Sequence, residues 1–192
     1  AHAPFATTVR DFDTVFGRLA VDREAAKRLS TAGGLVEESC LFSREHGVQA
    51  LLPFIRKAFP GASIVPVAIS IRSTRPDWDR LAAALAPIVD DETLVVESTD
   101  FSPYLPQHEA RLFDQQTLNV LAAGDLDEIA ALRQPDHADS VSALYIQTKL
   151  QRQIFDASPL VIANDNSQSY AAEPVAETTS YMVVLYGRFE PG

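Results

Sequence analysis

The chain has 192 residues, of which 46% are apolar and 22% are charged, a balance that excludes an intrinsically disordered protein. We expect one domain over residues 1–192, because this length is typical of a single core. The formal net charge of −10 argues against nucleic acid and anionic membrane surfaces as partners, since both are negatively charged. The sequence also lacks an apolar stretch of the roughly 20 residues that a membrane-spanning helix needs.

The cysteine content limits both disulfide and metal chemistry. Cys40 is the single cysteine, so an internal disulfide and a cysteine-based zinc site are excluded. A lone thiol is compatible with a reducing compartment, and the first residues show neither the basic nor the apolar region of a signal peptide. We therefore expect a cytoplasmic location.

In the first half of the chain, polar caps and apolar spacing predict two helices before a β-prone run. Asp22 can cap a helix over residues 23–30, which Gly33 and Gly34 follow. A second helix starts at Ser43, because apolar residues then recur on one face. The β-branched run 63–71 predicts a strand, and Pro66 within it indicates an edge position, a bulge or a strand start.

In the second half, helical and strand patterns alternate, which predicts an α/β fold. We expect a three-layer α/β/α arrangement with a mostly parallel or mixed central sheet. The predicted helices cover residues 76–88, 107–123, 125–132 and 140–150, the predicted strands cover 93–96, 159–163 and 181–186, and a polar loop covers 164–178.

Polar side chains are concentrated just after the predicted strand 93–96. They are Asp100, Ser102, Tyr104, His108 and Glu109. Ligands bind beyond the carboxyl ends of strands in open α/β sheets, so this is the first place to look for a site. Asp100 could orient a ligand or act as a general base there, or it could cap the following turn.

The histidines do not form a close metal-binding motif. His2, His46, His108 and His137 lie far apart in the sequence, so a metal site would need ligands from distant segments. Glu45 and His46 begin an amphipathic helix. The helix dipole alone favours a carboxylate at that position, and the functional alternative is an imidazole–carboxylate pair that faces a pocket.

Several segments together resemble the Memo family, also called AmmeMemoRadiSam system protein B. Residues 12–22 resemble the family's segment around "TPLG", and residues 44–53, REHGVQALLP, resemble its "EHS" helix. Residues 64–67, IVPV, resemble its "IVP" strand. Residues 97–102, ESTDFS, resemble its "SSD" segment, and Glu109-Ala110-Arg111 follows as in bacterial members.

The resemblance implies a fold similar to that of the class III extradiol dioxygenases, which hold non-haem iron through histidines and a carboxylate. It implies a divalent metal (iron, zinc or manganese) bound by His2, His46 and His137, with Glu45, His46 and Asp100 in catalytic roles. The sequence departs from the family in three places. Pro103 replaces a histidine, residues 136–140 lack the family's cysteine, and the N-terminal region looks shortened or divergent.

Three functions follow from the resemblance and its departures. The first is a Memo-like protein whose pocket binds a metal or a small molecule. The second is a non-catalytic binding or interaction module on the same scaffold, and the third is an extradiol-type ring-cleaving dioxygenase. The apolar C-terminal strand could pair with a second copy, so a homodimer stays open.

Overall fold

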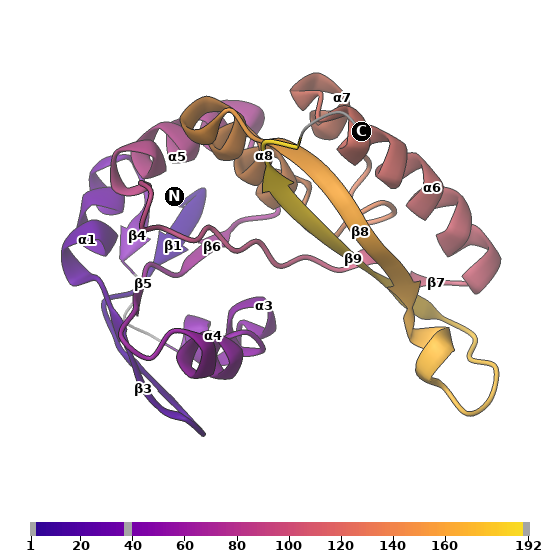
Figure 1. Ribbon diagram of the computed structural model, residues 1–192, viewed down its shortest axis with the longest axis horizontal. Coiled ribbons are helices and arrows are strands. Elements are labelled where there is room, and N and C mark those ends of the chain that lie inside the picture. The colour runs from indigo at the N-terminus through magenta and orange to yellow at the C-terminus, as the bar shows by residue number, and fades with distance from the viewer. Residues whose placement is uncertain (1–2, 37–39, 190–192) are drawn as a thin grey trace. The chain divides into compact units, whose positions relative to one another are not determined.

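The chain divides into two compact units, Ala1–Ile88 and Val89–Gly192, and the computed structural model describes residues 3–36 and 40–189 (Figure 1). Each unit has its own helices and sheets and is described by itself. Within the described ranges, none of the helices combines the length and the apolar character that a membrane crossing requires. The prediction of one domain over 1–192 stays a prediction.

The first unit contains two small mixed sheets. Their strand orders are β4-β1-β6 and β2-β3-β5, and each sheet has one parallel and one antiparallel pair. The strands are β1 Phe5–Thr7, β2 Phe12–Thr14, β3 Gly17–Val21, β4 Leu35–Val36, β5 Ser63–Ile64 and β6 Val67–Ile69. The helices are α1 Arg23–Thr31, α2 Leu41–Arg44, α3 His46–Gln49, α4 Leu52–Ala58 and α5 Arg75–Leu85, followed by the 3-10 turn η1 Ala86–Ile88.

Helix α1 begins where the sequence predicts it. The carboxylate of Asp22 accepts hydrogen bonds from the backbone N–H groups of Glu24 and Ala25, which have no partner inside the helix. The apolar face of α1 is buried through Ala26 and Leu29 against the first sheet and α5. This packing makes α1 part of the core of the first unit.

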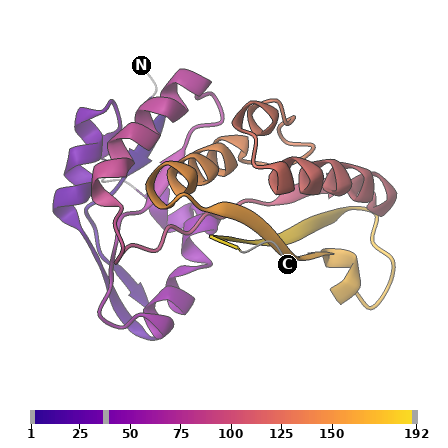
Figure 2. The same cartoon turned by 45° about the horizontal axis from the view of Figure 1, so that its top comes forward.

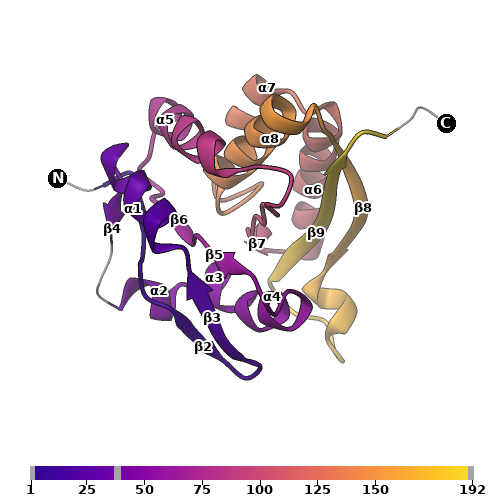
Figure 3. The ribbon, with the colours of Figure 1, turned by 60° about the vertical axis from the view of Figure 1, so that its left-hand side comes forward.

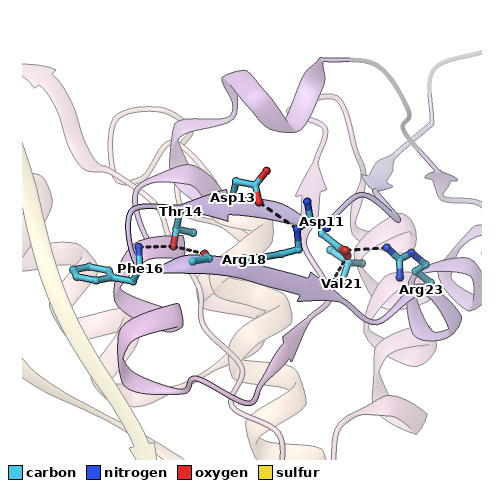
Figure 4. Close-up of polar contacts among 8 residues, drawn as sticks. Asp11, Asp13, Thr14, Phe16, Arg18, Val21 and Arg23 are labelled. Atoms are coloured by element: carbon cyan, nitrogen blue, oxygen red, sulfur yellow. Dashed lines mark hydrogen bonds and ion pairs between the residues drawn. The ribbon is translucent and has the colours of Figure 1, made fainter.

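The β2–β3 hairpin is closed by side-chain bonds to the backbone (Figure 4). The hydroxyl of Thr14 donates to the carbonyl of Gly17 at 2.7 Å across the turn. At the other end, Asp11 accepts from the N–H of Val21 at 3.0 Å and from the guanidinium of Arg23 at 2.9 Å. The Val21 bond and the Arg23 charge lower the pKa of the Asp11 carboxyl. Helix α4 lies beside this hairpin (Figure 3).

Residues 41–71 are more broken than their sequence pattern predicts. The helix expected from Ser43 is divided into α2, α3 and α4, and Glu45 caps α3 in an extended conformation between the first two. The β-prone run 63–71 is divided between β5 and β6, which belong to different sheets. Pro66 lies between them and has no N–H to donate to a ladder, which explains the interruption.

The second unit has one antiparallel sheet in the order β7-β9-β8. Its strands are β7 Phe101–Leu105, β8 Ser158–Asn166 and β9 Thr178–Gly187, and its helices are α6 Gln107–Ala123, α7 Leu126–Ala130 and α8 Val141–Phe155. Side-chain bonds from Ser180 to α6 and from Tyr186 to α8 leave the same face of β9, because alternate residues share a face. Both long helices therefore cover one side of the β8–β9 ribbon (Figure 2).

The α/β class is confirmed, and the helices of the second unit lie close to their predicted ranges. The mixed sheet that the sequence predicts as one alternative is confirmed in the first unit, and the sheet of the second unit is antiparallel. Much of the predicted loop 164–178 is ordered, because β8 continues to Asn166 and the 3-10 turn η2 covers Ser167–Tyr170. An Asn166 side chain that accepts from the N–H of Gln168 starts this turn.

Gly34 lies against the core of the first unit, so that a side chain added at this position would meet buried atoms. A Cβ there would collide with the buried ring of Phe5 and lie 3.0 Å from the carbonyl oxygen of Leu29. We expect Gly34→Ala to lower the free energy of unfolding by about 1–3 kcal/mol through overpacking. Gly61→Ala is the matched control, because nothing lies within 4 Å of a Cβ at Gly61. Equal melting temperatures for the two variants would contradict this packing.

Candidate functional site

The segment 93–100 of the second unit is not the strand that the sequence predicts. Among the described residues it pairs with no strand, and Leu94 and Val96 are 66% and 48% exposed. The carbonyl of Val95 instead accepts a hydrogen bond from Nε2 of Gln147 in α8, at 3.2 Å. The prediction of a buried strand over 93–96 is therefore wrong, because a helix side chain takes the place of a ladder bond.

Asp139 fixes the end of this segment to the start of α8. Its carboxylate accepts hydrogen bonds from the hydroxyl of Thr99 and, at 3.0 Å, from the N–H of Asp100. The N–H of Asp139 donates to the carbonyl of Asp100 at 2.9 Å, and the N–H of Ser140 donates to the Thr99 hydroxyl at 3.0 Å. Asp100 is half-buried and lies beside the start of α8. In the sequence it is 39 residues from Asp139, to which it bonds.

Glu97 has a strongly perturbed carboxyl group. Burial, together with the nearby charge of Asp139, raises the pKa of Glu97 to about 8. The residue is partly exposed, yet Oε1 of Glu97 is buried and has no hydrogen-bond partner among the described residues. Glu97 is therefore mostly protonated at neutral pH.

Two further polar side chains belong to the surroundings of Glu97. Oε1 of Gln147 is also buried without a partner in the described part of the chain. The hydroxyl of Tyr186 bonds to Oγ1 of Thr148 at 2.8 Å, and burial raises the pKa of Tyr186 to about 12, with a contribution from Glu97. We call Glu97, Asp100, Asp139 and Gln147 the acidic centre.

Beyond Asp100, the backbone turns into β7 through strained residues. Ser102 and Tyr104 have φ angles of 43° and 60°, a left-handed conformation that is costly for residues other than glycine. Asp114 of α6 is buried and accepts hydrogen bonds from the hydroxyls of Ser102 and Ser180 at 2.7 and 2.6 Å. The bond from Ser102 to Asp114 holds Ser102 in its strained conformation. The buried carboxylate therefore lies next to the strained backbone.

His137 has a structural setting. Its Nδ1 accepts from the N–H of Arg133 at 3.1 Å, so Nε2 donates to Oε1 of Gln116 at 2.9 Å. The ring lies edge-on against Phe113, and burial lowers the pKa of the imidazole. Both ring nitrogens are occupied, so His137 presents no free nitrogen to a metal.

The predicted site residues of the first unit lie at the start of α3. Oε1 of Glu45 accepts from the N–H of Gly47 at 3.3 Å, which makes Glu45 the helix cap, and His46 is exposed. The third predicted metal ligand, His2, lies outside the described residues. His46 and Asp100 belong to different units, so their convergence in one pocket stays a prediction.

The described residues do not supply a ligand set for a metal ion. Across residues 3–36 and 40–189, no group of three or more His, Cys, Asp or Glu side chains could hold one. Cys40 is free and exposed, and His108 and Glu109 form a solvent-exposed pair at 3.8 Å. Metal binding by His2, His46 and His137 stays a prediction, and the residues present do not fit it by themselves.

Sequence reasoning identified Asp100 but missed the residues that surround it. No local pattern predicted the bond from Asp139 to the backbone of Asp100 or the bond from Gln147 to Val95. A carboxylate directly followed by a helix cap, as in Asp139-Ser140, is a signal that could have suggested a tertiary anchor. The contacts of Gln147 with a segment 52 residues earlier left no local signal.

Comparison with known proteins relates the chain to one family. The family model described as Memo-like protein matches residues 2–142. A MEMO1 family protein of Caldivirga maquilingensis is 34% identical over 105 residues, which cover 51% of this chain and 36% of the relative. Relatives from Pyrobaculum aerophilum and Thermotoga petrophila are 30% and 27% identical over 57% and 60% of this chain, and 40% and 42% of their own lengths. The chain thus spans about two fifths of these relatives.

The setting of Glu97 predicts a specific pH dependence of stability. The folded state keeps the Glu97 proton up to pH about 8, whereas a glutamate carboxyl in water has an ordinary pKa of 4.5, so the folded state binds more protons between these values. The free energy of unfolding should therefore fall as the pH rises from 4.5 to 8, by on the order of a few kcal/mol.

The variant Glu97→Gln should remove this loss, because the amide cannot ionise. At pH 9 it should unfold at a higher denaturant concentration than the parent, and near pH 4.5 the two should be similar. Glu92→Gln, on the exposed part of the same segment, is the control and should follow the parent at both pH values. A parallel shift of Glu97→Gln and Glu92→Gln would contradict the burial of Glu97.

Proposed function

Because this chain belongs to the Memo-like protein family, we propose that it is a small-molecule-binding protein whose ligand contacts the acidic centre of the second unit. The observation that carries the proposal is the pair of buried acceptor oxygens, Oε1 of Glu97 and Oε1 of Gln147, which lack a donor among the described residues. A buried acceptor without a donor costs about 1–3 kcal/mol. A ligand hydroxyl, an ammonium group or a bound water molecule would supply the missing donors.

The proposal assigns separate roles to the residues of the centre. Glu97, which is protonated at neutral pH, can both donate and accept a hydrogen bond. Asp139 holds the backbone of Thr99 and Asp100, so it acts as a positioning residue. Asp100 would orient the ligand from its half-buried place beside α8.

Binding without catalysis is the form of the proposal that the residues favour. The proline at 103 replaces a histidine that the family resemblance led us to expect, and it is buried in β7. The region 136–140 has His137 in place of a thiol, and both nitrogens of His137 are occupied. These two positions would each have to supply a reactive group in a metal-dependent enzyme.

The alternatives from the sequence remain open as predictions. One is a metal-binding protein in which His2, His46 and His137 hold iron, zinc or manganese. In that protein Glu45 and Asp100 would have catalytic roles. Another is an extradiol-type dioxygenase, and the likeness to that fold stays a prediction. A homodimer, a cytoplasmic location and the exclusion of nucleic acid and membranes as partners also stay predictions.

Thermal unfolding with chosen probes tests the proposal. Catechol offers two neighbouring O–H donors and ethanolamine offers an ammonium group and a hydroxyl, so at least one should raise the melting temperature of the full chain. The rise should be reduced in Glu97→Gln and in Asp100→Asn and kept in Glu92→Gln. An equal rise in all three variants, or no rise with either probe, would argue against the acidic centre.

The same assay separates the metal alternative. Fe(II), Zn(II) and Mn(II) should leave the melting temperature unchanged if the ligand is a small organic molecule. A rise with one of these metals that disappears in His46→Ala, together with that metal in the freshly purified protein, would favour the metal-binding alternative.

A further inference from the structure

A polar concavity lies in the second unit, and the residues that line it are not those of the acidic centre. It has a volume of about 390 Å³ and lies between the first turns of α6, the end of β8 and η2. Leu118 is the one apolar residue among those that line it. The polar lining disfavours an apolar or aromatic ligand, because such a ligand would leave these polar groups without partners.

Two carboxylates contribute negative charge to this concavity. Asp114 is 5% exposed and is bonded to two serine hydroxyls, which are neutral donors. Asp165 accepts hydrogen bonds from the hydroxyl of Ser169 and, at 2.8 Å, from the N–H of Asn166, and these bonds lower its pKa. Within the described residues neither carboxylate forms an ion pair, so both charges lack a counter-ion.

Arg111 contributes the positive charge. It lies on α6 one turn before Asp114 and lines the same concavity. Its guanidinium forms no hydrogen bond or ion pair with any residue that the structure describes. A planar guanidinium with five free donors is suited to a carboxylate, which it can bind through two parallel hydrogen bonds.

We propose that this concavity binds a small zwitterion of about dipeptide size. The ligand's carboxylate would pair with Arg111, and its ammonium group would pair with Asp165 at the rim and Asp114 at the floor. The amides of Gln107 and Asn164, which can donate and accept, would bind the polar atoms between the two charges. A ligand that carries both charges gives each charged residue of the lining a group of opposite sign.

The volume supports a ligand larger than a single small amino acid. At about 30 Å³ per water molecule, 390 Å³ corresponds to roughly 13 water molecules. This is at the lower end of the roughly 300–1,000 Å³ that is usual for small-molecule sites. Two linked residues with short side chains fit within such a space and leave room for bound water.

Calorimetric titration of the full chain with three matched probes tests the charge requirement. Glycylglycine carries both charges, N-acetylglycylglycine carries only the carboxylate, and glycylglycinamide carries only the ammonium group. We expect glycylglycine to bind at least tenfold more tightly than either analogue, which is a difference of about 1.4 kcal/mol. Equal affinity for the three probes, or no binding of glycylglycine up to about 10 mM, would overturn the proposal.

Variants test the location of binding. Arg111→Gln and Asp165→Asn should each weaken glycylglycine binding at least tenfold, and both residues are exposed, so the fold should be kept. Arg10→Gln in the first unit is the matched control and should bind as the parent does. Unchanged binding by Arg111→Gln would place the ligand elsewhere.

Discussion

The carboxylate of Asp139 is the constraint on which the acidic centre depends. It binds the Thr99 hydroxyl and the Asp100 N–H, and its own N–H binds the Asp100 carbonyl. The segment 93–100 has no ladder bonds, so these contacts and the Gln147 bond to Val95 determine its path. Without the Asp139 carboxylate, the Thr99 hydroxyl and the Asp100 N–H would lose their acceptor at the start of α8.

The second unit buries carboxyl groups in three different ways. Asp139 receives donors from both a side chain and the backbone, and Asp114 receives two serine hydroxyls. Glu97 has a buried oxygen with no donor from the described residues and responds by keeping its proton. The first two arrangements stabilise the fold. The third leaves a buried oxygen without a hydrogen-bond donor from the described residues. That contrast is why Glu97, rather than Asp139, is the residue of the acidic centre that points to a ligand.

Local patterns predicted the helices of the second unit and the capped start of α1, because caps and apolar spacing act over a few residues. Local patterns failed where long-range contacts determine the conformation of a segment. The run 93–96 has high strand propensity, but Leu94 and Val96 face solvent, and the strand forms only after Asp100. The short strands β1 to β4 left little signal, since two to five residues give no measurable period.

The same reasoning explains what was predictable about the site. The position of Asp100 followed from a motif, and the family resemblance carried by residues 97–102 is confirmed. Asp139, which bonds to the backbone of Asp100, lies 39 residues further along the chain, and no pattern within one window encodes this contact. The occupied nitrogens of His137 depend on Gln116, 21 residues earlier, so a metal-ligand role could not be judged from sequence.

The family match ends at residue 142, but the sheet of the second unit does not. Strand β7, inside the match, pairs only with β9 among the described strands, and Ser180 of β9 bonds to Asp114. A fragment cut at the boundary of the match would therefore lose β7's ladder, one of the two donors to Asp114 and all but the first two residues of α8. Domain borders drawn from family similarity alone would cut through the second compact unit of this chain.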